Sequence, residues 1–69
     1  MANVNSNTGG YDKYVGKDII ITTEEWQGEF TKGCTYTITS NIYGIPVVVN
    51  DGGFESFDIL CYENDWCFK

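Results

Sequence analysis

Hydrophobic and polar residues alternate most regularly in the middle of the chain. Within residues 33–40, Cys34, Tyr36 and Ile38 alternate with threonines, the period of two that is typical of a strand with one buried face. Residues 45–50 are almost wholly apolar, as expected for a strand in the middle of a small sheet. The two runs predict a β-hairpin. In addition to Cys34, we expect its core face to carry four side chains: Tyr36, Ile38, Val47 and Val49.

Three further strands are predicted on either side of this hairpin. β-branched residues fill residues 17–23, and such residues fit a pleated, half-buried surface. Residues 54–59 alternate less regularly, although Phe57 and Ile59 can share one face. Residues 66–68 carry two aromatic side chains at a spacing of two and predict a short closing strand.

The pattern breaks between the first two strands, over residues 24–32. We expect a long loop there, with Gly28 at a turn and Phe30 returning to the core. A one-turn helix over residues 23–27 is the alternative, because threonine caps helices and glutamate suits their first turn. Pro46 lacks the N–H that a sheet ladder needs, so it should lie at the beginning of its strand.

Five short strands with one long first loop predict a single all-β domain over residues 11–69. Residues 1–10 are rich in asparagine, serine and glycine and predict a flexible tail. Consecutive antiparallel strands that close on themselves leave few exposed edges. We therefore predict a small five-stranded SH3-like barrel that is partly open.

The charge balance narrows the classes of partner. The chain has a formal net charge of −6, with ten acidic residues against four lysines and no histidine. All basic residues lie outside residues 34–68. A surface formed by this segment should repel nucleic acid and attract a basic protein, because phosphate contacts depend on basic side chains.

Three features argue against an enzyme or a metalloprotein. Without histidine, no side chain has an ordinary pKa suited to general base catalysis near neutral pH. The spacing of Cys61 and Cys67 does not fit a zinc site, and the turn at residues 50–53 lacks the further carboxylates of a calcium loop. We therefore predict no catalytic residue, no cofactor and no metal site.

The cysteines indicate the compartment. Their number is odd, and the sequence shows neither a secretory signal nor an apolar run long enough to span a bilayer. These features predict a reduced, cytoplasmic protein with no membrane contact. The alternation around Cys34 predicts a buried thiol, and a Cys61–Cys67 disulfide is the alternative for the other two cysteines.

Aromatic side chains in the predicted loops are the first candidates for a binding site. Trp26 lies in the long first loop, Tyr43 follows Ile42 in the hairpin loop, and Tyr62 lies before the closing strand. Exposed aromatic residues often supply most of the binding energy at protein interfaces. The alternative is that each of them covers one end of a thin core.

Carboxylates are the second candidates. Two acidic patches are predicted: Glu24, Glu25 and Glu29 in the first, and Asp51, Glu55, Asp58, Glu63 and Asp65 in the second. The functional interpretation is an array that mimics nucleic-acid phosphates and occupies a basic site on a partner. The alternative is a solvated surface that keeps a small protein soluble.

Four spaced motifs add a resemblance: F-x-K-G-x-x-Y-x-I from Phe30, G-x-P-V-V from Gly44, N-D-G from Asn50 and W-x-F from Trp66. Over residues 16–68 the chain resembles small acidic SH3-like barrel proteins encoded by tailed bacteriophages. The resemblance implies the barrel fold and a role in the host bacterium.

These observations predict a non-enzymatic module, encoded by a phage, that inhibits or modulates a bacterial host protein. The target would present a basic or mixed surface in the host cytoplasm, and the module would be a monomer or weak dimer. One alternative is a KOW-like module that binds nucleic acid or ribonucleoprotein through Lys13, Lys17 and Lys32. Another is a small structural protein that self-associates through a free sheet edge.

Overall fold

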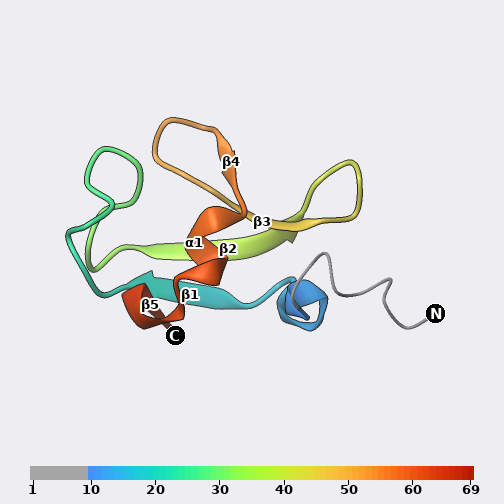
Figure 1. Cartoon of the computed structure of the whole chain (residues 1–69), viewed down its shortest axis with the longest axis horizontal. Coiled ribbons are helices and arrows are strands. Elements are labelled where there is room, and N and C mark those ends of the chain that lie inside the picture. Colours follow the sequence, from blue (N-terminus) through green and yellow to red (C-terminus); the bar gives the residue numbers. More distant parts are fainter. Residues whose placement is uncertain (1–9) are drawn as a thin grey trace.

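The computed structural model describes residues 10–69 and contains one antiparallel sheet of five strands (Figure 1). The strands are β1 (Asp18–Ile21), β2 (Thr35–Ser40), β3 (Pro46–Val49), β4 (Glu55–Ser56) and β5 (Trp66–Phe68). Their order is β4-β3-β2-β1-β5, so the last strand lies beside the first and the sheet is open between β4 and β5. The predicted five-stranded all-β fold is confirmed. Apart from Gly10, the predicted tail lies outside the described residues.

Three short helical segments complete the domain. They are the 3₁₀-helices η2 (Tyr11–Tyr14) and η3 (Glu63–Asp65) and the single-turn α-helix α1 (Asp58–Cys61). In Figure 1, α1 overlaps the middle of the sheet, whereas η2 lies beyond one end of β1. None of the helices in residues 10–69 is long and apolar enough to cross a membrane.

The core forms on one face of β1. Ile19 and Ile21 are fully buried and Ile20 is half-buried, as the alternation of β1 predicts. Because β1 pairs with β2 on one side and β5 on the other, its side chains contact neighbours from both. The buried cluster consists of Tyr11, Ile19, Ile21, Phe30, Ile38, Val48, Ile59, Leu60 and Trp66.

The predicted core residues of β3 are confirmed for Val47, which is buried, and wrong for Val49. Ile38 pairs with Val48, and directly opposed residues in an antiparallel pair share a face. Val48 is therefore the residue that joins the core cluster, whereas Val49 is 42% exposed. Val47 is buried, but outside that cluster. Continuous apolar runs leave the register open, because they carry no polar residues to mark a face.

The long first loop follows the prediction. Gly28 has φ +93°, a left-handed conformation that suits glycine. Phe30 is fully buried, and its amide donates to the carbonyl of Trp26 over 2.8 Å. The alternative helix at residues 23–27 does not form; the loop is a series of turns.

The fourth strand is shorter than predicted. It ends at Ser56, and α1 begins at Asp58. Ile59 and Leu60 are adjacent and both fully buried. In a strand they would point to opposite faces, but in a helix neighbouring residues can reach one core. The Ser56 hydroxyl also accepts a hydrogen bond from the Ile59 amide over 3.4 Å, which favours the helical turn.

Tyr11 and Trp66 each donate a side-chain hydrogen bond within the fold, and the bond of Tyr11 joins the two ends of the described chain. Tyr11 is 8% exposed and belongs to the core cluster. Its hydroxyl donates to the Glu63 carboxylate, and this bond is the largest cause that raises the pKa of Tyr11 to about 12. Trp66 Nε1 donates to the carbonyl of Ile59 over 2.8 Å. The fold thus uses Glu63 internally, although the sequence places it in an acidic binding patch.

The cysteines differ from the prediction. Cys34, Cys61 and Cys67 are all exposed, free thiols. The expected burial of Cys34 is wrong because β2 begins at Thr35, one residue later than the alternation suggests. The Cys34 amide donates instead to the Thr31 carbonyl over 3.1 Å, within a turn.

Candidate partner-binding surface

The hairpin loop between β2 and β3 is built around one asparagine side chain. Asn41 Oδ1 accepts hydrogen bonds from the amides of Tyr43 and Ile45, over 2.8 and 3.0 Å. The Gly44 amide donates to the Asn41 carbonyl over 2.9 Å, and Gly44 has φ +80°. A three-residue loop that ends in a left-handed glycine is a common hairpin connection. The loop therefore has a defined shape.

The loop between β3 and β4 repeats this arrangement. Asn50 Oδ1 accepts from the amides of Gly52 and Phe54, over 2.9 and 3.0 Å. The Gly53 amide donates to the Asn50 carbonyl over 3.0 Å, and Gly53 has φ +86°. We call the two segments, residues 41–45 and 50–54, the Asn41 loop and the Asn50 loop.

Both loops expose large apolar side chains. Ile42 is 89% exposed and Tyr43 is 79% exposed, so their predicted exposure is confirmed. Phe54 is 72% exposed and was not among the candidates. The exposure of Phe54 could have been expected from the sequence, because this aromatic residue directly follows a double-glycine turn and begins a run that alternates poorly. Folding explains none of these exposures, because the apolar surface gains nothing from remaining in water.

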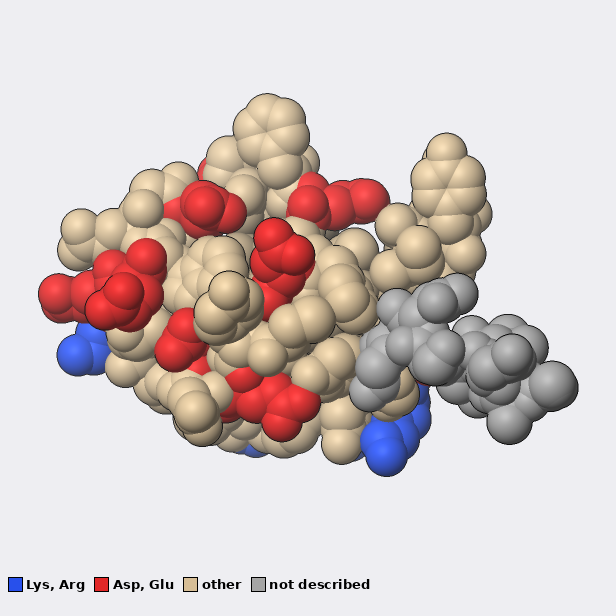
Figure 2. Space-filling model, viewed as in Figure 1, with Lys and Arg blue, Asp and Glu red and all other residues tan. Residues whose placement is uncertain are grey.

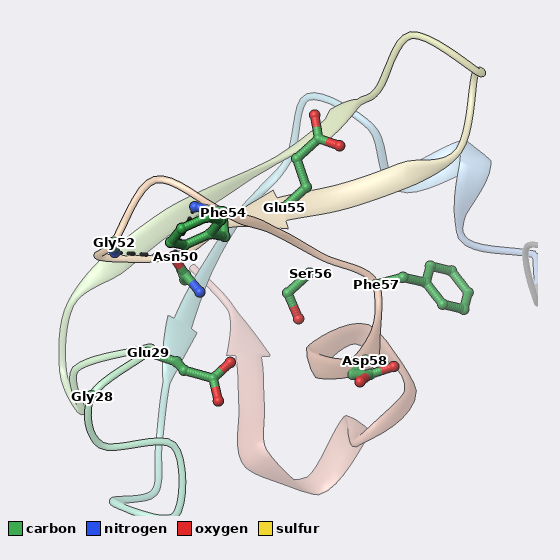
Figure 3. A pocket seen from close by; sticks show the side chains of 9 residues that line it. All are labelled: Gly28, Glu29, Asn50, Gly52, Phe54, Glu55, Ser56, Phe57 and Asp58. Atoms are coloured by element: carbon green, nitrogen blue, oxygen red, sulfur yellow. Dashed lines mark hydrogen bonds between the residues drawn. The ribbon is translucent and has the colours of Figure 1, made fainter.

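An acidic hollow of about 580 Å³ lies between the first loop, the Asn50 loop and the start of α1. Glu29 and Ser56 point into this space, and Asp58 lies across it from Glu29 (Figure 3). Glu55 and Phe57 belong to its rim and point away from it. The side chains that line the hollow carry negative charge and no compensating lysine.

A second hollow, of about 680 Å³, lies on the other side of Glu29. Trp26 Nε1 donates to Asp65 Oδ2 over 2.8 Å. The Trp26 ring packs edge-on against the Tyr62 ring, with 5.4 Å between the ring centroids. Trp26 is half-buried and packs against the core, as the alternative of a residue that covers one end of the core expects. Tyr62 is 58% exposed, and its predicted exposure is confirmed.

The carboxylates group differently from the two predicted patches. Glu29 lines both hollows, beside Glu55 and Asp58 in the first and beside Glu25 and Asp65 in the second. Glu24 lines neither hollow. In the view of Figure 2, carboxylates spread over the visible face and lysines appear only at its margin.

Asp51 has a structural role that the sequence did not reveal. Its carboxylate accepts hydrogen bonds from Thr31 Oγ1 and Tyr36 Oη, each over 2.7 Å. These bonds lower the pKa of Asp51 below its ordinary value, and the bond from Thr31 has the larger effect. Burial is the largest cause that raises the pKa of Tyr36. Both Asp51 oxygens are used within the fold, so Asp51 is a weaker candidate for partner binding than Glu29 or Asp58.

The geometry favours binding of a cation that carries an apolar stem. Negative side chains line the first hollow, and the exposed Phe54 ring lies at its edge. Within residues 10–69, no cluster of acidic or cysteine side chains is arranged to hold a metal ion. Comparisons of the chain with family models, with curated proteins and with solved structures found no match.

Proposed function

We propose that this chain is a small, non-enzymatic protein-binding module that docks onto a basic segment of another protein. The observation that carries the proposal is the exposure of Ile42, Tyr43 and Phe54 on two loops of defined shape, one of which carries Phe54 at an acidic hollow. Loop backbones held in this way lose little conformational freedom on binding.

A lysine or arginine side chain of the partner would enter the first hollow, with its charge near Glu29 and Asp58. Its apolar stem would lie against Phe54, because basic side chains bury their methylene groups on apolar surface. Ile42 and Tyr43 lie at the other end of β3 and would supply apolar anchors to a partner that spans both loops. The net charge of −6 would speed the encounter with a basic target.

The proposal includes an SH3-like fold and a phage origin. An open five-stranded sheet whose last strand pairs with its first supports the fold assignment. The motif resemblance to acidic phage proteins supports the origin, and it makes a bacterial host protein in the cytoplasm the proposed target.

Affinity capture from bacterial lysate tests the proposal. We expect the wild-type chain to capture a specific protein that carries a basic segment, and the double variant Ile42→Ser, Tyr43→Ala to lose it. Val15→Ala is the control, since Val15 is 41% exposed but lies outside both loops. Equal capture by the wild-type chain and the double variant would remove the Asn41 loop from the site.

A second pair of variants tests the hollow. Glu29→Gln with Asp58→Asn should weaken binding of the captured protein and reduce its dependence on salt. Glu24→Gln removes one charge outside both hollows and should have little effect. If Glu24→Gln weakens binding as much per charge removed as the double variant does, then only the overall charge matters. In that case the basic side chain does not bind in the hollow.

A further inference from the structure

A second surface of opposite charge lies around the beginning of β1. Tyr14, Lys17, Phe68 and Lys69 line a hollow of about 580 Å³, together with Gly16 and Asp18. Lys13 adjoins it, with Nζ 5.4 Å from the centre of the Tyr14 ring. Three of the four lysines of the chain are therefore gathered here. We call this the lysine surface.

Pairing of the first and last strands creates the lysine surface. Phe68 lies opposite Ile19, and the Lys69 amide donates to the Asp18 carbonyl over 3.0 Å. The Phe68 ring lies 4.9 Å from the Tyr14 ring and remains 45% exposed. The Trp66 ring packs edge-on against the Phe68 ring as well, with 5.2 Å between centroids. A partly exposed aromatic pair is thus held among cationic side chains.

The carboxylates of the two acidic hollows lie outside the lysine surface and do not cancel its positive charge. Neither acidic hollow shares a lining residue with the lysine surface. Its one carboxylate, Asp18, accepts a hydrogen bond from Thr37 Oγ1 over 2.7 Å. At physiological salt, charges are screened beyond about 8 Å. A ligand in this hollow would therefore respond mainly to the adjacent lysines.

We propose that the lysine surface binds a nucleotide unit, from a free nucleotide or a single-stranded nucleic acid. The phosphate would contact Lys17 and Lys69, and the base would lie against the exposed ring of Phe68 beside Tyr14. Lysines along a backbone path with aromatic rings for base stacking are the usual features of single-strand binding. An acidic peptide would use the lysines and leave the rings unused, so the nucleotide fits the combination better.

The sequence did not favour binding of nucleic acid, because residues 34–68 contain no basic residue. It also grouped Lys32, rather than Lys69, with Lys13 and Lys17. Lys32 is not among the residues that line the lysine surface. The proposal does not depend on the protein-binding function, because the two surfaces share no lining residue.

Binding of a fluorescent oligo-dT at low salt tests the charge contribution. Lys17→Glu with Lys69→Glu should weaken binding more than tenfold. Lys32→Glu changes the charge by the same amount as each of these substitutions, but it should change the affinity for oligo-dT by no more than about twofold. With two phosphate contacts, from Lys17 and Lys69, log K should fall with log salt at a slope of roughly −1.4. Undetectable binding at low salt, or an equal loss per charge with Lys32→Glu, would overturn the proposal.

A second set of measurements tests the contribution of the rings. Phe68→Leu keeps an apolar side chain and should weaken oligo-dT binding about tenfold, since stacking of one base contributes about 1–3 kcal/mol. Inorganic polyphosphate and poly-glutamate should compete more weakly than oligo-dT. Equal competition by either one, or unchanged binding by Phe68→Leu, would show that the surface recognises anions without bases and overturn the nucleotide assignment. Competition by AMP as strong per nucleotide as by oligo-dT would assign the site to free nucleotides; stronger competition by oligo-dT would assign it to single strands.

Discussion

The Asn41 loop and the Asn50 loop share one backbone framework but have different surroundings. In each loop, an asparagine side chain accepts hydrogen bonds from two backbone amides of the loop, and a glycine in the left-handed conformation precedes the next strand. The Asn41 loop places Ile42 and Tyr43 at its tip, where both are almost fully solvated. The Asn50 loop places Asp51 at the equivalent position, and Asp51 bonds to two side chains elsewhere in the fold.

This difference separates structural residues from candidate binding residues. The Asp51 amide also donates to the Glu29 carbonyl over 2.8 Å, so the Asn50 loop is held against the first loop. These contacts explain why a polar residue occupies that tip. The apolar tip of the Asn41 loop forms no comparable contact within the described residues, which makes an external partner the better explanation for Ile42 and Tyr43.

The largest expected effects come from the shared asparagines. Asn41→Ala and Asn50→Ala each remove two hydrogen bonds and should lower the free energy of unfolding by about 1–3 kcal/mol. Urea unfolding measures both. The aspartate variants retain Oδ1 as an acceptor and should lose less. A difference of more than about 1 kcal/mol between the two alanine variants would contradict the equivalence of the two frameworks.

The left-handed glycines should give the next largest effects. Gly44→Ala and Gly53→Ala place a Cβ in an unfavourable conformation and should each cost about 1–2 kcal/mol. A Cβ at either position would meet nothing within 4 Å, so the backbone alone sets the cost. Gly52→Ala is the control, because its φ lies outside the left-handed range. Thermal unfolding would contradict this account if Gly52→Ala proved the most harmful of the three.

The bonds of Asp51 predict a dependence on pH that is specific to the Asn50 loop. Its pKa in the folded state lies below the ordinary value of 3.8. The carboxylate therefore stabilises the fold above pH 3.8 and loses this effect as the pH falls through the folded pKa. Asp51→Asn should lower the melting temperature at pH 6 and have less effect at pH 2.5. An equal loss for Asp51→Asn at both pH values would exclude the linkage.

The smallest effect on stability is expected at the apolar tip. Ile42→Ser with Tyr43→Ala should change the free energy of unfolding by no more than about 0.5 kcal/mol, because both side chains are solvated. The same double variant is expected to abolish capture of the partner. A loss of stability above about 1 kcal/mol would show that the tip packs within the fold, and the contrast between the two loops would disappear.

Local patterns predicted most of the fold. β-branched residues identified β1, alternation identified β2 and a continuous apolar run identified β3. The break in the pattern identified the first loop, with Gly28 and Phe30 correctly placed. The register of β3 and the end of β4 could not be predicted, because each depends on contacts formed only in the folded chain. Val48 joins the core through its pairing with Ile38, and Ile59 with Leu60 requires a helical turn.

The candidate surfaces were predicted less completely. Ile42 and Tyr43 were identifiable because a short loop can rarely bury two adjacent apolar residues. The sequence left open whether Trp26 is exposed or covers the core, since its bond to Asp65 joins residues 39 positions apart. The lysine surface was missed for the same reason, as Tyr14 and Phe68 come from opposite ends of the described chain.

Pairing of β5 with β1 also determines when the domain can form during synthesis. Ile21 at the end of β1 pairs with Trp66, so the first strand lacks one neighbour until the last strand has been made. A nascent chain that ends at residue 65 also lacks the buried indole of Trp66. Because such contacts between distant residues must form together, folding awaits translation of residue 68. On the ribosome, this domain should therefore behave as one indivisible folding unit.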